Sequence, residues 1–122
     1  MQVRNHILVA FMLAACATSA HASQANSRAP LADCVNLGED HQAVRFGTQY
    51  VLIENGDAHY RLKFNGSCDA LTVATSVEIS TDGQANRLCP ENSRLTSRTK
   101  SCSVRSVDLI DADTYERYKR RR

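Results

Sequence analysis

The chain lacks the short motifs on which many catalytic sites are built. Its five glycines form neither a glycine-rich phosphate loop nor a G-x-S-x-G nucleophile turn, and no H-E-x-x-H zinc motif occurs. No two cysteines have the C-x-x-C spacing, and neither His41 nor His59 stands at ligand spacing from a cysteine. We therefore expect no metal, no cofactor and no enzymatic activity.

Aromatic residues are also scarce, with three phenylalanines, four tyrosines and no tryptophan. They do not alternate with basic residues in the pattern that stacks single-stranded nucleic acid, so we expect no nucleic-acid partner. The one long apolar run, Ile7–Ala17, is too short to span a bilayer comfortably as a permanent helix. We therefore expect membrane attachment only through a lipid on Cys16.

Residues 1–22 have the organisation of a secretory signal peptide. Arg4 gives a positive start, the apolar run follows, and Ala20-His21-Ala22 forms an A-x-A cleavage signal. Cleavage after Ala22 leaves 122 − 22 = 100 residues, of which 23–32 are small and polar and are expected to form a flexible lead-in. This arrangement predicts a periplasmic or secreted protein.

A lipobox competes with this cleavage site. Residues 13–16, Leu-Ala-Ala-Cys, fit the pattern in which Cys16 is lipidated and becomes the first residue of an outer-membrane lipoprotein. We favour ordinary cleavage because the A-x-A signal is well formed and the apolar run before Leu13 is short for a lipoprotein signal. Both alternatives export the protein.

Four cysteines remain after cleavage at Ala22, namely Cys34, Cys68, Cys89 and Cys102. An even number of cysteines in a short exported chain indicates two disulfides formed in an oxidising compartment. Of the three possible connectivities we predict Cys34 with Cys68 and Cys89 with Cys102, since each bond then links the two ends of one sequence block. Each disulfide is expected to stabilise the fold by about 2 to 4 kcal/mol by restricting the unfolded chain.

The clearest structural signal is the segment 49–64, in which two alternating apolar runs are joined by Asn55-Gly56. An Asn-Gly pair between such runs predicts a β-hairpin with a type I′ turn, in which Ile53 faces Ala58. One face then carries the core residues Val51, Ile53, Tyr60 and Leu62. The other face is expected to meet water or a partner and carries Tyr50, Leu52, His59, Arg61 and Lys63.

Shorter alternations extend the β pattern on both sides of this hairpin. Residues 90–100 are polar and aperiodic and are expected to form a loop, and Asp111 or Asp113 is expected to cap a short helix with Tyr115 and Tyr118. The expected further strands lie at 35–37, 44–46, 72–81, 86–89 and 102–110, the last with a bulge near Arg105 or Ser106.

These elements predict an all-β protein with a short C-terminal helix, built as a small antiparallel barrel or sandwich of five or six strands. Residues 33–111 are expected to form the disulfide-stapled β domain, and residues 112–122 the short helix and a basic tail. A length of about ninety residues is enough for one small domain and not for two.

Basic residues are concentrated in two segments. Five of the six residues from Arg117 to Arg122 are basic, and the segment 87–105 has five basic residues against Glu91 alone. Such segments attract anionic phospholipid headgroups, lipopolysaccharide or polymer, although charge runs are also common in solvated loops and tails. The residues predicted to make the binding contacts are Arg87, Arg94, Arg98, Lys100 and Arg105.

Two features of the hairpin bear on catalysis. His59 lies on the outer face close to Asp57 and is a candidate general base, but a lone strand histidine is more often a plain surface residue. Glu54 and Asp57 flank the turn opposite each other, where such a carboxylate pair is usually just solvated. A hydrolase that uses His59 is therefore the weakest functional alternative.

Several short motifs follow one another in the order Cys34, Tyr60-Arg61-Leu62, Gly66-Ser67-Cys68 with Leu71, Asn86-Arg87-Leu88-Cys89, and Cys102 before Val104, Val107 and Asp108. In this order the chain resembles, over about residues 33–110, a family of small exported proteobacterial proteins labelled only as a domain of unknown function. The resemblance implies export, frequent lipoprotein anchoring and a compact β domain, and it supplies no catalytic residues. Cys89 departs from the family's commoner three-cysteine pattern.

Together these features predict a non-enzymatic binding module for an envelope component or another protein. The alternative is an inhibitor of an enzyme such as a lysozyme or a protease, because small stapled β domains present rigid loops well. Residues 90–100 would then be the inserting loop.

The two alternatives for the N-terminus differ in intact mass. We expect protein purified from its native host to start at Ser23 and to gain four hydrogens on reduction, two for each disulfide. Mass spectrometry with and without reduction measures both quantities. A mass that starts at an acylated Cys16 would instead establish a membrane-tethered module.

Overall fold

The computed structural model describes residues 28–73 and 76–121. The predicted signal peptide 1–22, with its Cys16 lipobox, and residues 23–27 of the predicted lead-in lie outside the described residues. The described elements are β1 (Arg28–Pro30), β2 (Val35–Asn36), β3 (Gln42–Phe46), β4 (Tyr50–Asn55), β5 (Ala58–Phe64), α1 (Ala70–Val73), β6 (Glu78–Thr81), β7 (Gln84–Ala85), β8 (Arg87–Leu88), β9 (Ser93–Thr96), β10 (Ser101–Ile110) and α2 (Ala112–Arg120).

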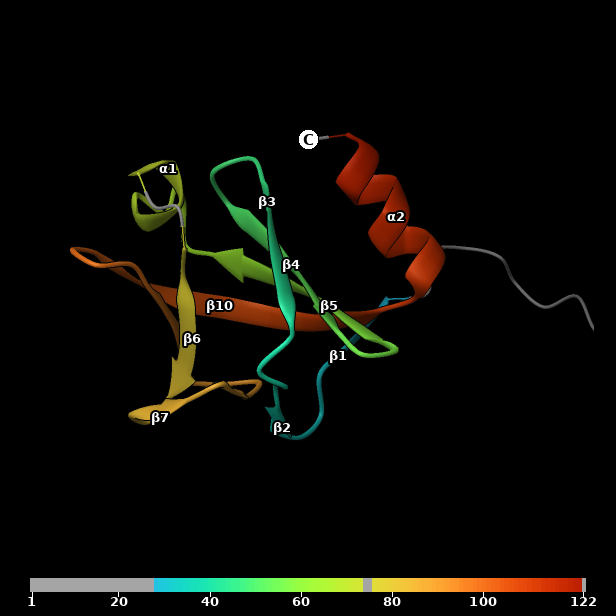
Figure 1. The fold of residues 1–122 in the computed structure, drawn as a ribbon, viewed down its shortest axis with the longest axis horizontal. Helices are drawn as coiled ribbons and strands as arrows, with labels where there is room; N and C mark the ends of the chain where they lie inside the picture. Colours follow the sequence, from blue (N-terminus) through green and yellow to red (C-terminus); the bar gives the residue numbers. More distant parts are fainter. Residues whose placement is uncertain (1–27, 74–75, 122) are drawn as a thin grey trace, which may run out of the picture.

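Eight of these strands form one antiparallel sheet that curls into a half-barrel (Figure 1). The strand order is β3-β4-β5-β10-β9-β6-β7, with β1 also paired to β10, while β2 and β8 pair with each other. The long strand β10 runs across the middle of the molecule and is shared by both halves of the sheet (Figure 1). The prediction of a small, curled, all-β protein with a short C-terminal helix is confirmed.

The predicted hairpin is present as β4 and β5, but its register differs by one residue pair. Ile53 pairs with Tyr60, and the turn consists of Gly56 and Asp57, of which only Gly56 has a positive φ, at 58°. A positive φ at the first central residue alone is the requirement of a type II′ turn, not of the expected type I′. Each β4 residue therefore pairs with a β5 residue two positions beyond the predicted one. Because side chains alternate between the two faces of a strand, a shift by two leaves the predicted division of residues between the faces unchanged.

The side chain of Asn55 explains why this residue stays in the strand. Its Oδ1 accepts a hydrogen bond from Gly38 N at 2.8 Å, and its Nδ2 donates to Asn36 O at 3.3 Å. These two bonds tie the end of β4 to β2 and to the loop that follows it. A contact between segments that are distant in sequence therefore overrides the local Asn-Gly turn preference.

The strand predicted at 72–81 is wrong in its first part, because residues 70–73 form the short helix α1 and only Glu78–Thr81 is a strand. Leu71 is buried in the core, and its carbonyl oxygen accepts a hydrogen bond from Arg45 Nη1. The Asp82-Gly83 turn is confirmed, with both residues at positive φ. Its return strand is Gln84–Ala85, however, and not 86–89.

The loop predicted at 90–100 is also wrong, since Ser93–Thr96 is strand β9 and lies between β10 and β6. Ser93 and Leu95 point inward and are 1% and 0% exposed. Ser93 tolerates burial because its hydroxyl accepts from Cys89 N at 2.8 Å and donates to Cys89 O at 2.9 Å. The polar composition that suggested a loop therefore includes an inward-facing serine whose hydrogen bonds are satisfied.

The sheet has an apolar core on each of its two faces. The inside of the half-barrel holds the larger core, which contains the predicted residues Val51, Ile53, Tyr60 and Leu62 together with residues of β6, β8, β9 and β10. On the opposite face, helix α2 packs over β3, β4 and β5 (Figure 1). There Leu52, Ile110 and Tyr115 form a second buried cluster. The face predicted to meet water is thus largely covered by the chain's own helix.

The structure contains two disulfides, but the predicted pairing is wrong. Cys34 is bonded to Cys89, and Cys68 is bonded to Cys102. The first pair continues the β2–β8 ladder, in which Val35 lies opposite Leu88, so the two cysteines are the next residues to face each other. Two intramolecular disulfides indicate an oxidising environment outside the cytoplasm.

Part of the predicted flexible lead-in is ordered. Residues 28–30 form β1, which pairs with β10, and Leu31 N donates to Val107 O at 2.9 Å. These backbone bonds fix the start of the described chain to the main sheet. In the ranges that the structure describes, no helix is long and apolar enough to cross a membrane.

The disulfide pairing can be tested directly, because trypsin separates the four cysteines into the peptides 29–45, 64–87, 88–94 and 101–105. We expect the non-reduced digest to contain 29–45 linked to 88–94 and 64–87 linked to 101–105. The reduced digest serves as the control, since all four peptides should then appear separately. A linked species of 88–94 with 101–105 would contradict this fold.

Candidate functional site

Helix α2 begins with a cap formed by Asp111. Its Oδ1 accepts a hydrogen bond from Thr114 N at 2.7 Å, as predicted for this residue or Asp113. The hydrogen bonds from Thr114, together with the nearby Arg117 guanidinium, hold the pKa of the Asp111 carboxyl below its ordinary value. The cap fixes where the helix starts and hence which of its side chains face the sheet.

The side chains of α2 that face the sheet bury His59. This histidine is only 9% exposed, and its ring centroid lies 4.7 Å from that of Tyr115. Its Nε2 is 3.5 Å from Glu54 Oε2, because β4 and β5 place these two residues opposite each other. The prediction of a plain surface histidine is wrong, and so is the pairing of Glu54 with Asp57 across the turn.

A cluster of aromatic and basic side chains surrounds Arg61 on the same face of the sheet. The Nη1 of Arg61 donates to the Tyr118 hydroxyl at 3.1 Å, and its Nη2 donates to Asp108 Oδ2 at 3.0 Å. The guanidinium carbon also lies 5.1 Å from the centroid of the Tyr50 ring and 5.6 Å from that of Tyr118. Arg61 therefore connects β4, β5, β10 and α2.

Arg61 and its partner Asp108 are largely shielded from solvent. Its side chain is 12% exposed, and that of Asp108 is 16% exposed. Within the described ranges, Arg61 Nε is the one buried side-chain nitrogen or oxygen that lacks a hydrogen-bond partner. Asp108 also lies 3.7 Å from Arg28 Nε, so one carboxylate is shared by two guanidinium groups. This end of the molecule consequently keeps an excess of positive charge.

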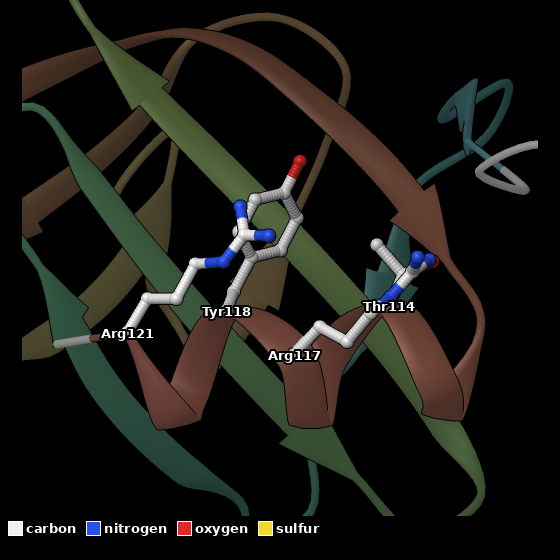
Figure 2. A pocket seen from close by; sticks show the side chains of 4 residues that line it. All are labelled: Thr114, Arg117, Tyr118 and Arg121. Atoms are coloured by element: carbon white, nitrogen blue, oxygen red, sulfur yellow. The ribbon is translucent and has the colours of Figure 1, made fainter.

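A small pocket lies on the side of α2, lined by Thr114, Arg117, Tyr118 and Arg121 (Figure 2). Its volume is about 110 Å³. The Arg117 and Arg121 side chains extend over the helix surface on either side of the Tyr118 ring (Figure 2). Arg117 Nη2 donates to Thr114 Oγ1 at 3.2 Å. We call these four residues the α2 pocket.

Four of the five predicted binding residues lie on one hairpin, formed by β9 and β10. Arg94 is on β9, Arg98 and Lys100 are in the connecting turn, and Arg105 is at the bulge of β10. All four are exposed. We call this set the hairpin cations. Lys100 Nζ lies 3.7 Å from Asp69 Oδ2, and within residues 28–73 and 76–121 the other three form no ion pair.

A polar hollow of about 370 Å³ adjoins the hairpin, and Arg94 is one of its lining residues. Arg94 Nε donates to Ser101 Oγ at 3.1 Å, which holds the guanidinium against the sheet surface. The other residues that line the hollow are Asp82, Gly83, Asn92, Ser93, Ser103 and Val104. The lining thus combines one guanidinium with hydroxyl and amide groups and with the carboxylate of Asp82.

Arg87 is not part of this arrangement. It lies on β8, half-buried, with Nη1 donating to Gln84 Oε1 at 2.9 Å and Nε donating to Cys89 Sγ at 3.4 Å. These contacts hold the β7–β8 segment next to the first disulfide. Arg87 was predicted as a binding residue together with the hairpin cations only because it is close to them along the chain.

The sequence predicts the α2 pocket only in part. It predicts a basic tail from the run that starts at Arg117, but no local pattern indicates that Arg121 lies beside Tyr118, which Arg61 of strand β5 holds in place. The nearest signal is the i, i+4 spacing of Arg117 and Arg121, which places both on one helix face.

No three His, Cys, Asp or Glu side chains of the described ranges lie together in a way that could hold a metal ion. No family model matches the chain, and no curated protein or solved structure is significantly similar to it.

The central position of Arg61 predicts a large effect on stability when its side chain is removed. We expect Arg61→Ala to lower the free energy of unfolding by about 2 to 3 kcal/mol, because Asp108 keeps only its longer contact with Arg28. Arg105→Ala, on the same sheet but exposed, should change it by less than about 0.5 kcal/mol. Urea denaturation measures both variants, and equal effects would refute a structural role for Arg61.

Proposed function

We propose that the protein is an exported, non-enzymatic binding module that attaches to an anionic component of the cell envelope through the hairpin cations. The observation that carries this proposal is the position of Arg94, Arg98, Lys100 and Arg105 on one exposed hairpin. Three of these residues form no ion pair within the described ranges. Their charge is therefore available to a partner.

The electrostatics of such a surface favour an extended anionic partner. Each Lys or Arg near an anionic membrane surface contributes about 1 kcal/mol to binding, and the attraction decreases as salt screens it. Phosphate groups are common to phospholipid headgroups and lipopolysaccharide, and guanidinium groups pair with them through two parallel hydrogen bonds.

Two disulfides in a small domain support a site of action in the periplasm or outside the cell. There the protein meets the envelope surfaces directly. If Cys16 is lipidated, the tether holds the domain beside the membrane and so raises the effective concentration of the hairpin cations at the headgroups.

A second function, inhibition of an enzyme such as a lysozyme or protease, has support from the rigidity of the same hairpin. Residues 90–100 are not one free loop, and of the two short connections left within them we take the β9–β10 turn as the segment that would enter an active site. That turn is closed by Ser97 N donating to Lys100 O at 2.8 Å, and the Cys68–Cys102 disulfide ties the adjoining strand to the loop after β5. Inhibition of lysozymes or proteases at stoichiometric concentrations would favour this function over envelope binding.

The hydrolase alternative gains no support from the geometry. His59 lies against the Tyr115 ring, and its Nε2 is 3.5 Å from Glu54 Oε2. Neither of these two contacts is with the serine, threonine or cysteine nucleophile that a histidine base activates. We therefore assign His59 a packing role.

The proposal predicts which charges matter for envelope binding. We expect Arg98→Gln with Arg105→Gln to weaken binding to vesicles of phosphatidylcholine and phosphatidylglycerol about 30-fold, since two lost contacts cost about 2 kcal/mol. The same measurement with lipopolysaccharide micelles shows which of the two phosphate-bearing surfaces the protein binds more tightly. Co-sedimentation at fixed ionic strength measures the affinities.

The matched control is Lys119→Gln with Arg120→Gln, which removes the same charge from α2. It should weaken binding less than about threefold by reducing net charge alone. Equal losses in the two double variants would mean that net charge and not the hairpin determines binding. Absence of wild-type binding to both surfaces would overturn the proposal.

A further inference from the structure

We propose that the α2 pocket is a second site, which binds a single tetrahedral oxyanion of the phosphate class. This second site contains none of the hairpin cations, so it is additional to the proposed function. All four lining side chains, Thr114, Arg117, Tyr118 and Arg121, carry hydrogen-bond donors, and no carboxylate of residues 28–73 or 76–121 lines the pocket. Such a lining suits a ligand that only accepts hydrogen bonds.

The hydrogen bonds inside the protein leave the hydroxyl of Tyr118 available as a donor. Thr114 Oγ1 accepts from Arg117 Nη2 at 3.2 Å, and the Thr114 side chain is also hydrogen-bonded to the Asp111 carboxyl, so its one proton is used within the protein. The Tyr118 hydroxyl oxygen accepts from Arg61 Nη1 at 3.1 Å and, within the described ranges, donates to no protein acceptor. Its proton therefore remains for an acceptor in the pocket.

The contact with Arg61 also fixes the position of the Tyr118 hydroxyl. Arg61 is held in turn by Asp108 at 3.0 Å and by the Tyr50 ring, so Tyr118 cannot turn away without breaking this cluster. The Tyr118 ring also packs on Phe46, with 5.2 Å between the ring centroids. The donor is therefore preorganised, which lowers the entropic cost of binding.

Arg121 supplies positive charge at the mouth of the pocket. It is exposed and forms no ion pair with any residue of the described ranges. Arg117 lies one helical turn before it, so the two guanidinium groups flank the Tyr118 ring from the same helix face (Figure 2). Guanidinium groups arranged in this way are suited to bidentate contacts with a phosphate.

The volume of about 110 Å³ limits the bound group to a small one. A tetrahedral oxyanion, either free or as the terminal group of a phosphomonoester, matches both the size and the guanidinium and hydroxyl groups of the lining. A larger ligand would have to extend past Arg121 into solvent. The neighbouring hollow on α2 differs, because its lining includes the carboxylates of Asp111, Asp113 and Glu116 beside Arg117 and Arg120. Those carboxylates repel an anion, so Arg120 serves as the matched control.

The test is a titration of the full chain with inorganic phosphate at constant ionic strength, followed by the amide and arginine Nε signals in NMR spectra. We expect saturable shifts at α2, and we expect Arg121→Gln to raise the dissociation constant about tenfold. Tyr118→Phe, which keeps the ring and removes the hydroxyl whose proton is available, should raise it about threefold. Arg120→Gln should change it less than twofold, although it removes the same charge.

Parallel titrations with sulfate and with glycerol phosphate distinguish a free oxyanion from the headgroup of a phosphomonoester. Tighter binding of glycerol phosphate than of inorganic phosphate indicates a ligand that extends past Arg121, and equal binding indicates a free oxyanion; both support the site. Shifts that do not saturate, or equal losses for Arg121→Gln and Arg120→Gln, would overturn it. Because Arg98→Gln with Arg105→Gln should leave phosphate binding unchanged, failure of this site and failure of the proposed function are distinguishable.

Discussion

A single β-bulge in strand β10 sets the geometry on which most of the structure depends. Between Val104 and Ser106 the strand has one more residue than its partner β5, which shifts the alternation of its side chains. Val104 and Val107 therefore both point into the half-barrel, while Ile110 points to the opposite face under α2. Without this shift Ile110 would face the larger core, and the helix would lose a main apolar contact.

The same bulge divides β10 into two parts with different partners. Before it, the strand pairs with β9 and presents a polar outer surface with the hairpin cations; after it, the strand pairs with β1 and is covered by α2. The molecule thus has two separate positive regions, one extended and exposed on a hairpin and one small, partly open pocket beside a helix. Their shapes suit different ligands, a charged surface in the first case and a single oxyanion in the second.

Local patterns in the sequence were sufficient for the features that depend on neighbouring residues. The alternation around Val51 and Leu62 identified the two faces of the central hairpin, and the phase change near Arg105 identified the bulge. Asp111 was recognised as a possible helix cap because a carboxylate is stabilised by the free amide groups at the start of a helix. The turn register failed at Asn55, whose side chain is bound to a loop that precedes it by almost twenty residues.

The sequence by itself thus determined the β character, the number of disulfides, the C-terminal helix and the gathering of basic residues in two segments, because composition and short-range periodicity carry that information. Only the tertiary structure decided that Cys34 bonds to Cys89, since this follows from the pairing of β2 with β8. It also decided that Ser93 is buried and that Tyr118 is held by Arg61 beside Arg121. These features depend on contacts between strands and helices far apart in the chain, whose register no local pattern encodes.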